Sequence, residues 1–170
     1  MRADRAYEGL TAARRKLFDW IRPLSQEQYT TQSPIGLHSL RATMIEIARG
    51  EWIYSLRLRG ETAPPREQWP ISEEKQPAFA ALESLWTEQA KRTQALLAST
   101  KDWDRPVEYS AQMGGKTVHI SATAGDIVTQ LLFHEVHHRA QAMAMLRALG
   151  VEAQNLDYSG MMFRRTEVPA

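Results

Sequence analysis

The sequence of 170 residues predicts an all-α protein, a four-helix bundle with one small β-hairpin before the last long helix. Three observations support this fold class. Apolar residues recur at steps of three and four in four long segments, loop-forming residues separate those segments, and only one short stretch alternates between apolar and polar residues. A chain of this length normally buries one core, so we expect a single domain over residues 1–170.

The four helical segments have recognisable ends. They are expected over residues 3–20, 39–60, 78–98 and 123–150. In the first, Arg and Lys are expected on the face opposite the apolar residues. Ser39 is the expected cap of the second, and a capping-box pattern at 123–126 precedes the fourth.

The connections between the helices differ in character. Residues 60–77 contain four prolines, which makes regular structure there improbable and predicts a long connection within the domain. Residues 106–121 alternate around Met113-Gly114-Gly115 and predict the hairpin. The tail, residues 151–170, has few apolar residues, and we expect it to pack loosely.

Composition excludes several classes of function. The absence of cysteine excludes disulfides, thiolate metal sites and a cysteine nucleophile. Because 21 basic and 20 acidic residues leave a net charge of +1, no general field attracts nucleic acid or an anionic membrane. No signal-peptide h-region or apolar stretch of about 18 residues is evident. We therefore expect a cytoplasmic protein that acts on a small molecule.

The residues with the clearest chemistry are His134 and His138. Their spacing of four places both imidazoles on one side of a helix, where they can bind one metal ion. Both residues also fall within an apolar stripe of that helix. Neutral imidazole suits zinc, nickel, copper or iron, and a catalytic site usually takes three protein ligands. Glu46, in the second helix, is the best third ligand, and His38 is the reserve.

Other interpretations of these residues remain open. A histidine on an apolar face can be a hydrogen-bonded core residue, and Glu46 can be the ion-pair partner of Arg41, Arg49 or Arg139. Arg139 and Gln141 can steady the ligands or contact substrate, or simply lie on the helix surface. His137 is expected to be a surface or interface residue, and His119, on the hairpin, is expected to be incidental.

The fourth helix also carries a second apolar strip. The strip has two explanations, contact with a further helix of the bundle or a homodimer interface. Its members are Val128, Leu132, Val136 and Met143.

His134 to His138 also matches His-Glu-x-x-His, the zinc-peptidase pattern in which Glu135 would be the general base. Such enzymes need a third ligand after the helix. The residues downstream contain no histidine, so a metallopeptidase is the lesser alternative.

Several motifs together resemble the DinB/YfiT-like superfamily of metalloenzymes. They are Ser39-Leu40-Arg41-Ala42-Thr43-Met44, the Glu51-Trp52 pair, the hairpin, and His134-x-x-x-His138-Arg139-Ala140-Gln141 followed by Leu146-Arg147-Ala148-Leu149-Gly150. The resemblance implies an up-down-down-up bundle, commonly a homodimer, that holds a divalent metal such as zinc or nickel through three histidines.

The sequence departs from this pattern at Glu46, which aligns with the family's first histidine. Since a carboxylate can also bind iron or manganese, we expect the site to persist with an altered metal preference rather than to have lost its metal. Ala140, where the family often has glycine, is a minor departure. The resemblance implies a metal-dependent, thiol-dependent S-transferase that uses a low-molecular-weight thiol. A non-catalytic metal-binding or stress-related dimer is the alternative.

Overall fold

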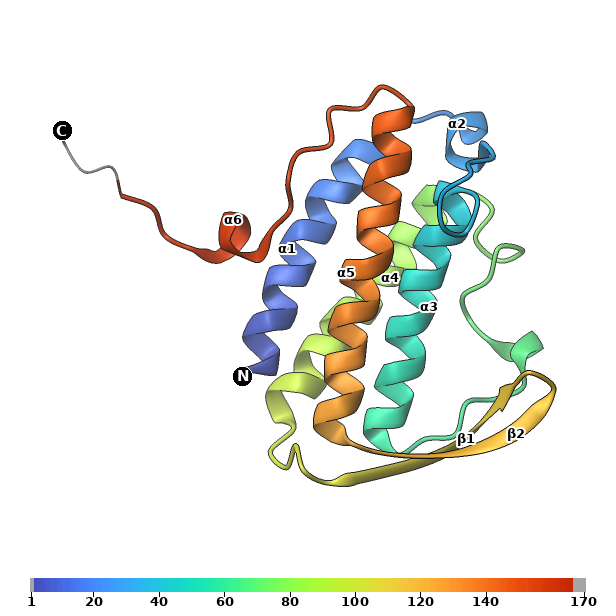
Figure 1. Cartoon of the computed structure of the whole chain (residues 1–170), viewed down its shortest axis with the longest axis vertical. Coiled ribbons are helices and arrows are strands. Elements are labelled where there is room, and N and C mark those ends of the chain that lie inside the picture. Colours follow the sequence, from blue (N-terminus) through green and yellow to red (C-terminus); the bar gives the residue numbers. More distant parts are fainter. Residues whose placement is uncertain (1, 167–170) are drawn as a thin grey trace.

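The computed structural model describes residues 2–166. Four long helices form the bundle (Figure 1). Two of them, α1 and α5, run in one direction, while α3 and α4 run in the other, which confirms the up-down-down-up order. Both α1 and α3 pack against α4 and α5. The helix bounds are α1 Ala3–Ile21, α3 Leu40–Arg59, α4 Phe79–Ser99 and α5 Ala124–Ala148.

The helix ends follow from local sequence. The Ser39 hydroxyl accepts a hydrogen bond from the backbone N–H of Ala42, and α3 stops at Gly60, whose φ of 75° is left-handed. The start of α5 is a capping box, because the Thr123 side chain and the Asp126 carboxylate each accept a hydrogen bond from the other residue's backbone. The predicted helix limits agree with the structure to within two residues.

The predicted hairpin is also present. Strand β1 (Pro106–Met113) pairs with β2 (Lys116–Thr123) in an antiparallel register that places Met113 opposite Lys116. The two residues between them, Gly114 and Gly115, have φ of 57° and 76°, as a two-residue hairpin turn with both φ values positive requires. The hairpin crosses the end of the bundle at which α3 ends and α5 begins (Figure 1).

The long connection between α3 and α4 is mostly irregular, as expected. Its one regular piece is the 3-10 turn η1 (Arg66–Gln68). The connection follows the outer side of α3 (Figure 1), where Trp69 packs against Trp52 with ring centroids 5.9 Å apart. Ile71, only 1% exposed, anchors it in the core.

The remaining segments attach to the outside of the bundle. A short helix, α2 (Gln26–Thr30), precedes α3. The tail places Ala153 and Leu156 in the core and forms the short helix α6 (Tyr158–Met162) beside α1, while its last described residues extend away from the bundle (Figure 1).

The second apolar strip of α5 packs mostly within the chain. Val128, Leu132 and Met143 are buried, whereas Val136 is 45% exposed beside the exposed Phe133. Contact within the bundle therefore accounts for three of its four members. Within residues 2–166, no helix combines the length and apolar character that crossing a membrane requires.

Candidate metal centre

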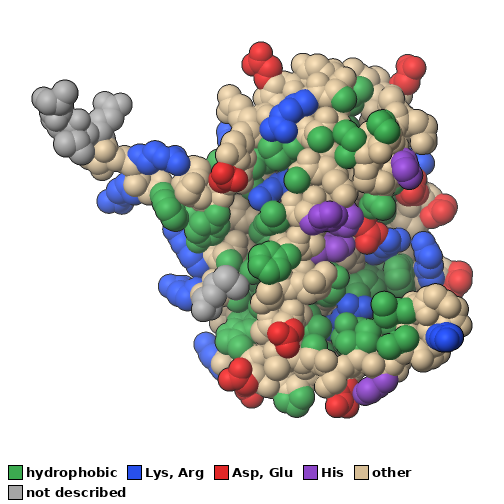
Figure 2. All heavy atoms as spheres, in the orientation of Figure 1, with side chains coloured by type: hydrophobic (Ala, Val, Ile, Leu, Met, Phe, Trp, Pro, Cys, Tyr) green, Lys and Arg blue, Asp and Glu red, His purple; other side chains and the backbone are tan. Residues whose placement is uncertain are grey.

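The three predicted ligands lie together at the interface between α3 and α5. Glu46 projects from α3, and His134 and His138 project from adjacent turns of α5. Each offers one ligand atom, and these atoms all lie within 4.8 Å of one another. Figure 2 shows histidine and acidic side chains gathered at mid-height on the face formed by these helices. The triad is therefore half-buried and open to small molecules.

The spacing of two ligand atoms matches a metal site. The Nε2 atom of His134 is 3.4 Å from Oε1 of Glu46. Two ligands bonded at about 2.1 Å to one tetrahedral ion lie about 3.4 Å apart. The rings of His134 and His138 are 4.6 Å apart between centroids. The donor set of two imidazoles and one carboxylate is one that zinc, nickel, iron and manganese accept.

A glycine makes room for His134 on α3. Gly50 lies one turn after Glu46, and a Cβ there would come within 2.4 Å of Cε1 of His134. The imidazole therefore occupies the space that any other residue would fill. This close approach explains how His134 of α5 reaches the Glu46 carboxylate of α3.

The Glu46 carboxylate is held ionised. It forms an ion pair with Arg49, one turn later on α3. The hydrogen bond from His134, together with the charge of Arg49, holds the pKa of the Glu46 carboxyl below its usual value. The sequence left Glu46 open as either a ligand or an ion-pair partner. The structure shows the ion pair, with Arg49 on Oε2, and leaves Oε1 facing His134, where it fits the ligand role as well.

Gln141 orients His138. Its Oε1 lies 2.8 Å from Nδ1 of His138, so an N–H at Nδ1 donates to the amide and leaves the Nε2 lone pair available. The Gln141 amide nitrogen lies 3.0 Å from Nε2 of His137, which can accept its hydrogen. Burial lowers the pKa of His138, which favours the neutral form that binds metal.

The other sequence candidates lie elsewhere. His38 sits on an exposed loop with a positive φ of 65°, its Nδ1 is 3.3 Å from the Ser33 carbonyl oxygen, and it is not part of the triad. His119 is exposed on β2, 3.8 Å from Glu108. Arg139 is buried on the side of α5 that faces the tail, where it donates a long hydrogen bond of 3.5 Å to the Leu156 carbonyl oxygen.

Glu135, the base of the peptidase interpretation, has a different partner. It is only 3% exposed, and both its carboxylate oxygens accept hydrogen bonds from Arg14 of α1. A carboxylate held in this way is not free to take a proton from water at the triad. The geometry therefore opposes the peptidase mechanism.

Arg14 also binds Glu51 of α3, and this buried network was not predicted. Arg14 is 3% exposed, contrary to the expectation that the basic residues of the first helix lie on its outer face. The Glu51 carboxylate accepts four hydrogen bonds, from Tyr7 (2.7 Å), Arg14 (2.6 Å), Trp86 (2.9 Å) and Thr93 (2.7 Å). The network thereby joins all four long helices.

A signal for this network exists in the sequence. Arg14 continues the apolar steps of three and four on α1, between Leu10 and Leu17. Glu51 and Glu135 fall on the apolar stripes of their own helices in the same way. One basic and two acidic residues within three such stripes indicate a buried ion-pair cluster.

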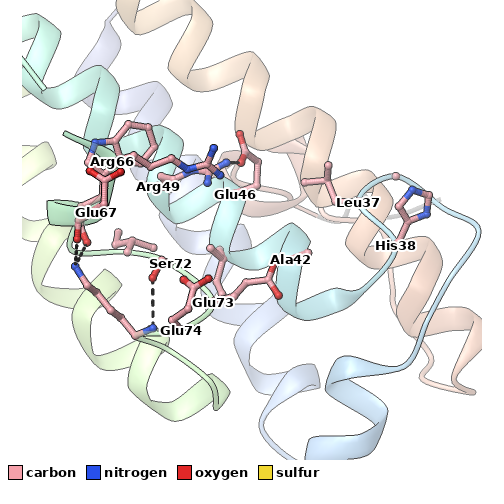
Figure 3. Close-up of a pocket in the computed structure, with 15 residues that line it drawn as sticks. Leu37, His38, Ala42, Glu46, Arg49, Arg66, Glu67, Ser72, Glu73 and Glu74 are labelled. Atoms are coloured by element: carbon pink, nitrogen blue, oxygen red, sulfur yellow. Dashed lines mark hydrogen bonds and ion pairs between the residues drawn. The ribbon is translucent and has the colours of Figure 1, made fainter. Parts of the chain in front are cut away.

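The triad borders a cleft of about 700 Å³ that runs along the outer side of α3. Figure 3 shows that its walls come from α3, from the loop at Leu37 and His38, and from the connection between α3 and α4. Glu46 belongs both to this cleft and to the triad. A molecule in the cleft therefore has direct access to the Glu46 carboxylate.

Comparison with known proteins supports the resemblance. A sequence model of the DinB family matches residues 1–167. The chain belongs to the DinB family. A search of curated proteins found no match. In this DinB-family chain, the carboxylate of Glu46 stands where the resemblance implies a histidine. The grouping of Glu46, His134 and His138 fits a DinB-like metal-binding protein.

Proposed function

We propose that this DinB-family protein binds one divalent metal ion through Glu46, His134 and His138 and acts as a metal-dependent enzyme of the S-transferase type. The observation that carries the metal site is the convergence of three ligand atoms within 4.8 Å, two of them at the spacing of a tetrahedral site. Zinc and nickel are the first candidates, and the carboxylate also admits iron or manganese.

The residues of the chain prepare the site for this chemistry. When bound, the ion would supply a Lewis acid that lowers the pKa of a thiol or water in its open position. Glu46 is ionised, His138 is held neutral, and Gln141 fixes the orientation of the His138 ring. The adjoining cleft offers space for a small-molecule substrate.

Metal analysis tests the site. We expect purified protein to carry close to one divalent ion per chain. His138→Ala should lose it, and Glu46→Ala should bind it at least about tenfold more weakly. His119→Ala, which removes an exposed histidine outside the triad, is the matched control. Unchanged metal content in His138→Ala would refute the assignment.

Activity is tested separately, on protein whose metal content is known. A screen of thiol conjugation to small electrophiles should show turnover that depends on the metal and disappears in His138→Ala. Turnover that persists in His138→Ala would refute the enzyme proposal and leave the metal site standing.

A second candidate is a non-catalytic metal-binding protein. The ion pair between Glu46 and Arg49 favours it, because this pair already compensates the carboxylate charge without a metal and so suits reversible binding. If the conjugation screen shows no turnover while metal occupancy is full, this second candidate is supported.

A further inference from the structure

A small cavity, here called the tail cavity, opens between α1, α5 and the tail. It measures about 130 Å³, and none of the three metal ligands lines it. Arg139 is the one charged residue among the described residues that line it. The larger apolar side chains of its walls are Leu10, Leu132, Phe133, Val136, Leu156 and Tyr158.

Arg139 is buried with almost all of its hydrogen-bonding capacity unused. Only 8% of the residue is exposed. A guanidinium group carries five N–H donors. Within residues 2–166, however, Arg139 makes a single side-chain hydrogen bond, the 3.5 Å contact with the Leu156 carbonyl oxygen, and its Nη1 is buried without a partner. Because a buried cation without a partner is costly, this position calls for an acceptor.

The nearby carboxylates do not fill that role. Glu135 and Asp157 act on Arg139 through their charges, but both are engaged elsewhere. Both oxygens of Glu135 accept hydrogen bonds from Arg14. Asp157 is exposed and accepts a hydrogen bond of 2.6 Å from the Asn155 amide. The acceptor for Arg139 is therefore expected from outside the chain.

The mouth of the tail cavity is an exposed apolar surface. Phe133 is 67% exposed, Val136 45% and Tyr158 43%. The Tyr158 ring is packed so closely on α1 that a Cβ at Gly9 would come within 2.6 Å of it. Exposed apolar side chains around a preformed hollow are typical of a binding site. Together with one buried cation, they match a molecule that has an apolar body and one anionic end.

We propose that the tail cavity binds a small monocarboxylic acid, whose carboxylate pairs with Arg139 and whose apolar body lies against the cavity walls. One guanidinium can donate two parallel hydrogen bonds to one carboxylate, which the unused donors of Arg139 permit. Since a cavity of about 150 Å³ holds benzene, 130 Å³ admits one aromatic ring or a short alkyl chain. This site is separate from the triad and does not depend on the proposed function.

The test compares acids with their own neutral amides. Benzoate and benzamide, and hexanoate and hexanamide, are titrated into the full chain by calorimetry. We expect at least one acid to bind about tenfold more tightly than its amide, because hydrogen bonds to an ionised acceptor are the stronger ones. The preference should be the same in metal-loaded and metal-free protein. A preference that requires the metal would place the acid at the triad and overturn the inference.

Val136→Glu is the decisive variant, and it should fold because Val136 is exposed. Its carboxylate would lie three residues before Arg139 on α5, a spacing at which the two side chains can pair. Acid binding should therefore weaken at least about tenfold. Val136→Gln, of the same size but uncharged, is the matched control and should keep the preference. Arg139→Gln should bind acid and amide alike.

Three results would overturn the inference. Wild-type protein could bind acids and amides equally. The preference could survive in Val136→Glu or Arg139→Gln. Finally, sedimentation could show a wild-type dimer that Phe133→Ser dissociates, in which case a second copy of the chain covers the mouth of the cavity.

Discussion

An alanine at position 50 would place its Cβ 2.4 Å from Cε1 and 2.7 Å from Nδ1 of His134. Non-bonded carbon atoms pack at about 3.5–4.0 Å, so the imidazole of His134 would have to retreat by about 1 Å. The atom that must move belongs to a side chain, and alanine favours a helix by about 1 kcal/mol over glycine. Gly50→Ala should therefore keep the fold and displace one ligand.

The expected loss of metal affinity is large. Metal–ligand distances tolerate deviations of about 0.2 Å, which is well below the required displacement. Changes to groups that merely orient a ligand cost about 10- to 100-fold in affinity, so displacing His134 itself should cost about 100-fold or more.

The assay is competition for zinc with a chromophoric chelator, combined with thermal unfolding of the metal-free protein. Gly160→Ala is the control, because a Cβ at Gly160 in α6 has nothing within 4 Å. His134→Ala gives the reference for complete loss of this ligand. Wild-type zinc affinity in Gly50→Ala, with unchanged stability, would refute the close packing of His134 against α3.

Three further predictions concern other parts of the chain. In Gly36→Ala, at a φ of +51°, the new Cβ would lie 2.5 Å from Oε1 of Gln141, which orients His138. This variant should weaken zinc binding about tenfold in the same competition assay. Gly114→Ala, also at positive φ but with nothing within 4 Å, should not. Glu135→Gln should lower the free energy of unfolding by about 3 kcal/mol in urea and should weaken metal affinity less than His134→Ala does; loss of metal at unchanged stability would contradict this role. Burial raises the pKa of Tyr29 above its usual value, so the folded hydroxyl stays protonated where the unfolded one ionises, and stability should fall above about pH 10. Because the Tyr29 hydroxyl has no hydrogen-bond partner within residues 2–166, Tyr29→Phe should be neutral or stabilising at pH 8 and should show a shallower decline towards pH 11.

The fold could be predicted because its determinants are local. Apolar residues at steps of three and four define each helix, and Ser39, Gly60 and the capping box at Thr123 mark helix ends through contacts within a few residues. The placement of the histidine pair could be predicted for the same reason, since a spacing of four residues is sufficient to place both rings on one side of the helix.

Glu46 could be predicted as a site residue for a different reason. A carboxylate flanked by small and apolar residues on a bundle helix needs a compensating partner, and the two histidines offered a metal as that partner. The sequence could not show that Arg49 would bind the same carboxylate, because several arginines lie within reach of it along the chain.

The buried network and the cleft depend on distant pairings. Arg14 meets Glu51 and Glu135 across 37 and 121 residues of sequence. Likewise, Arg66 and Trp69 line the same cleft as Glu46 only because the irregular connection folds back along α3. The steps of three and four locate Arg14 on an apolar stripe, but they do not identify which carboxylates on the other helices face it.

The Arg14 network also has a consequence for the metal ligands. Glu51 follows Glu46 by little more than one turn of α3, and Glu135 is the neighbour of His134 on α5. By binding both carboxylates in the core, Arg14 fixes the alignment of α3 and α5 along their axes. It does so close to the turns whose outer sides carry Glu46 and His134. Metal affinity should then depend on α1 as well, although α1 supplies no ligand to the triad.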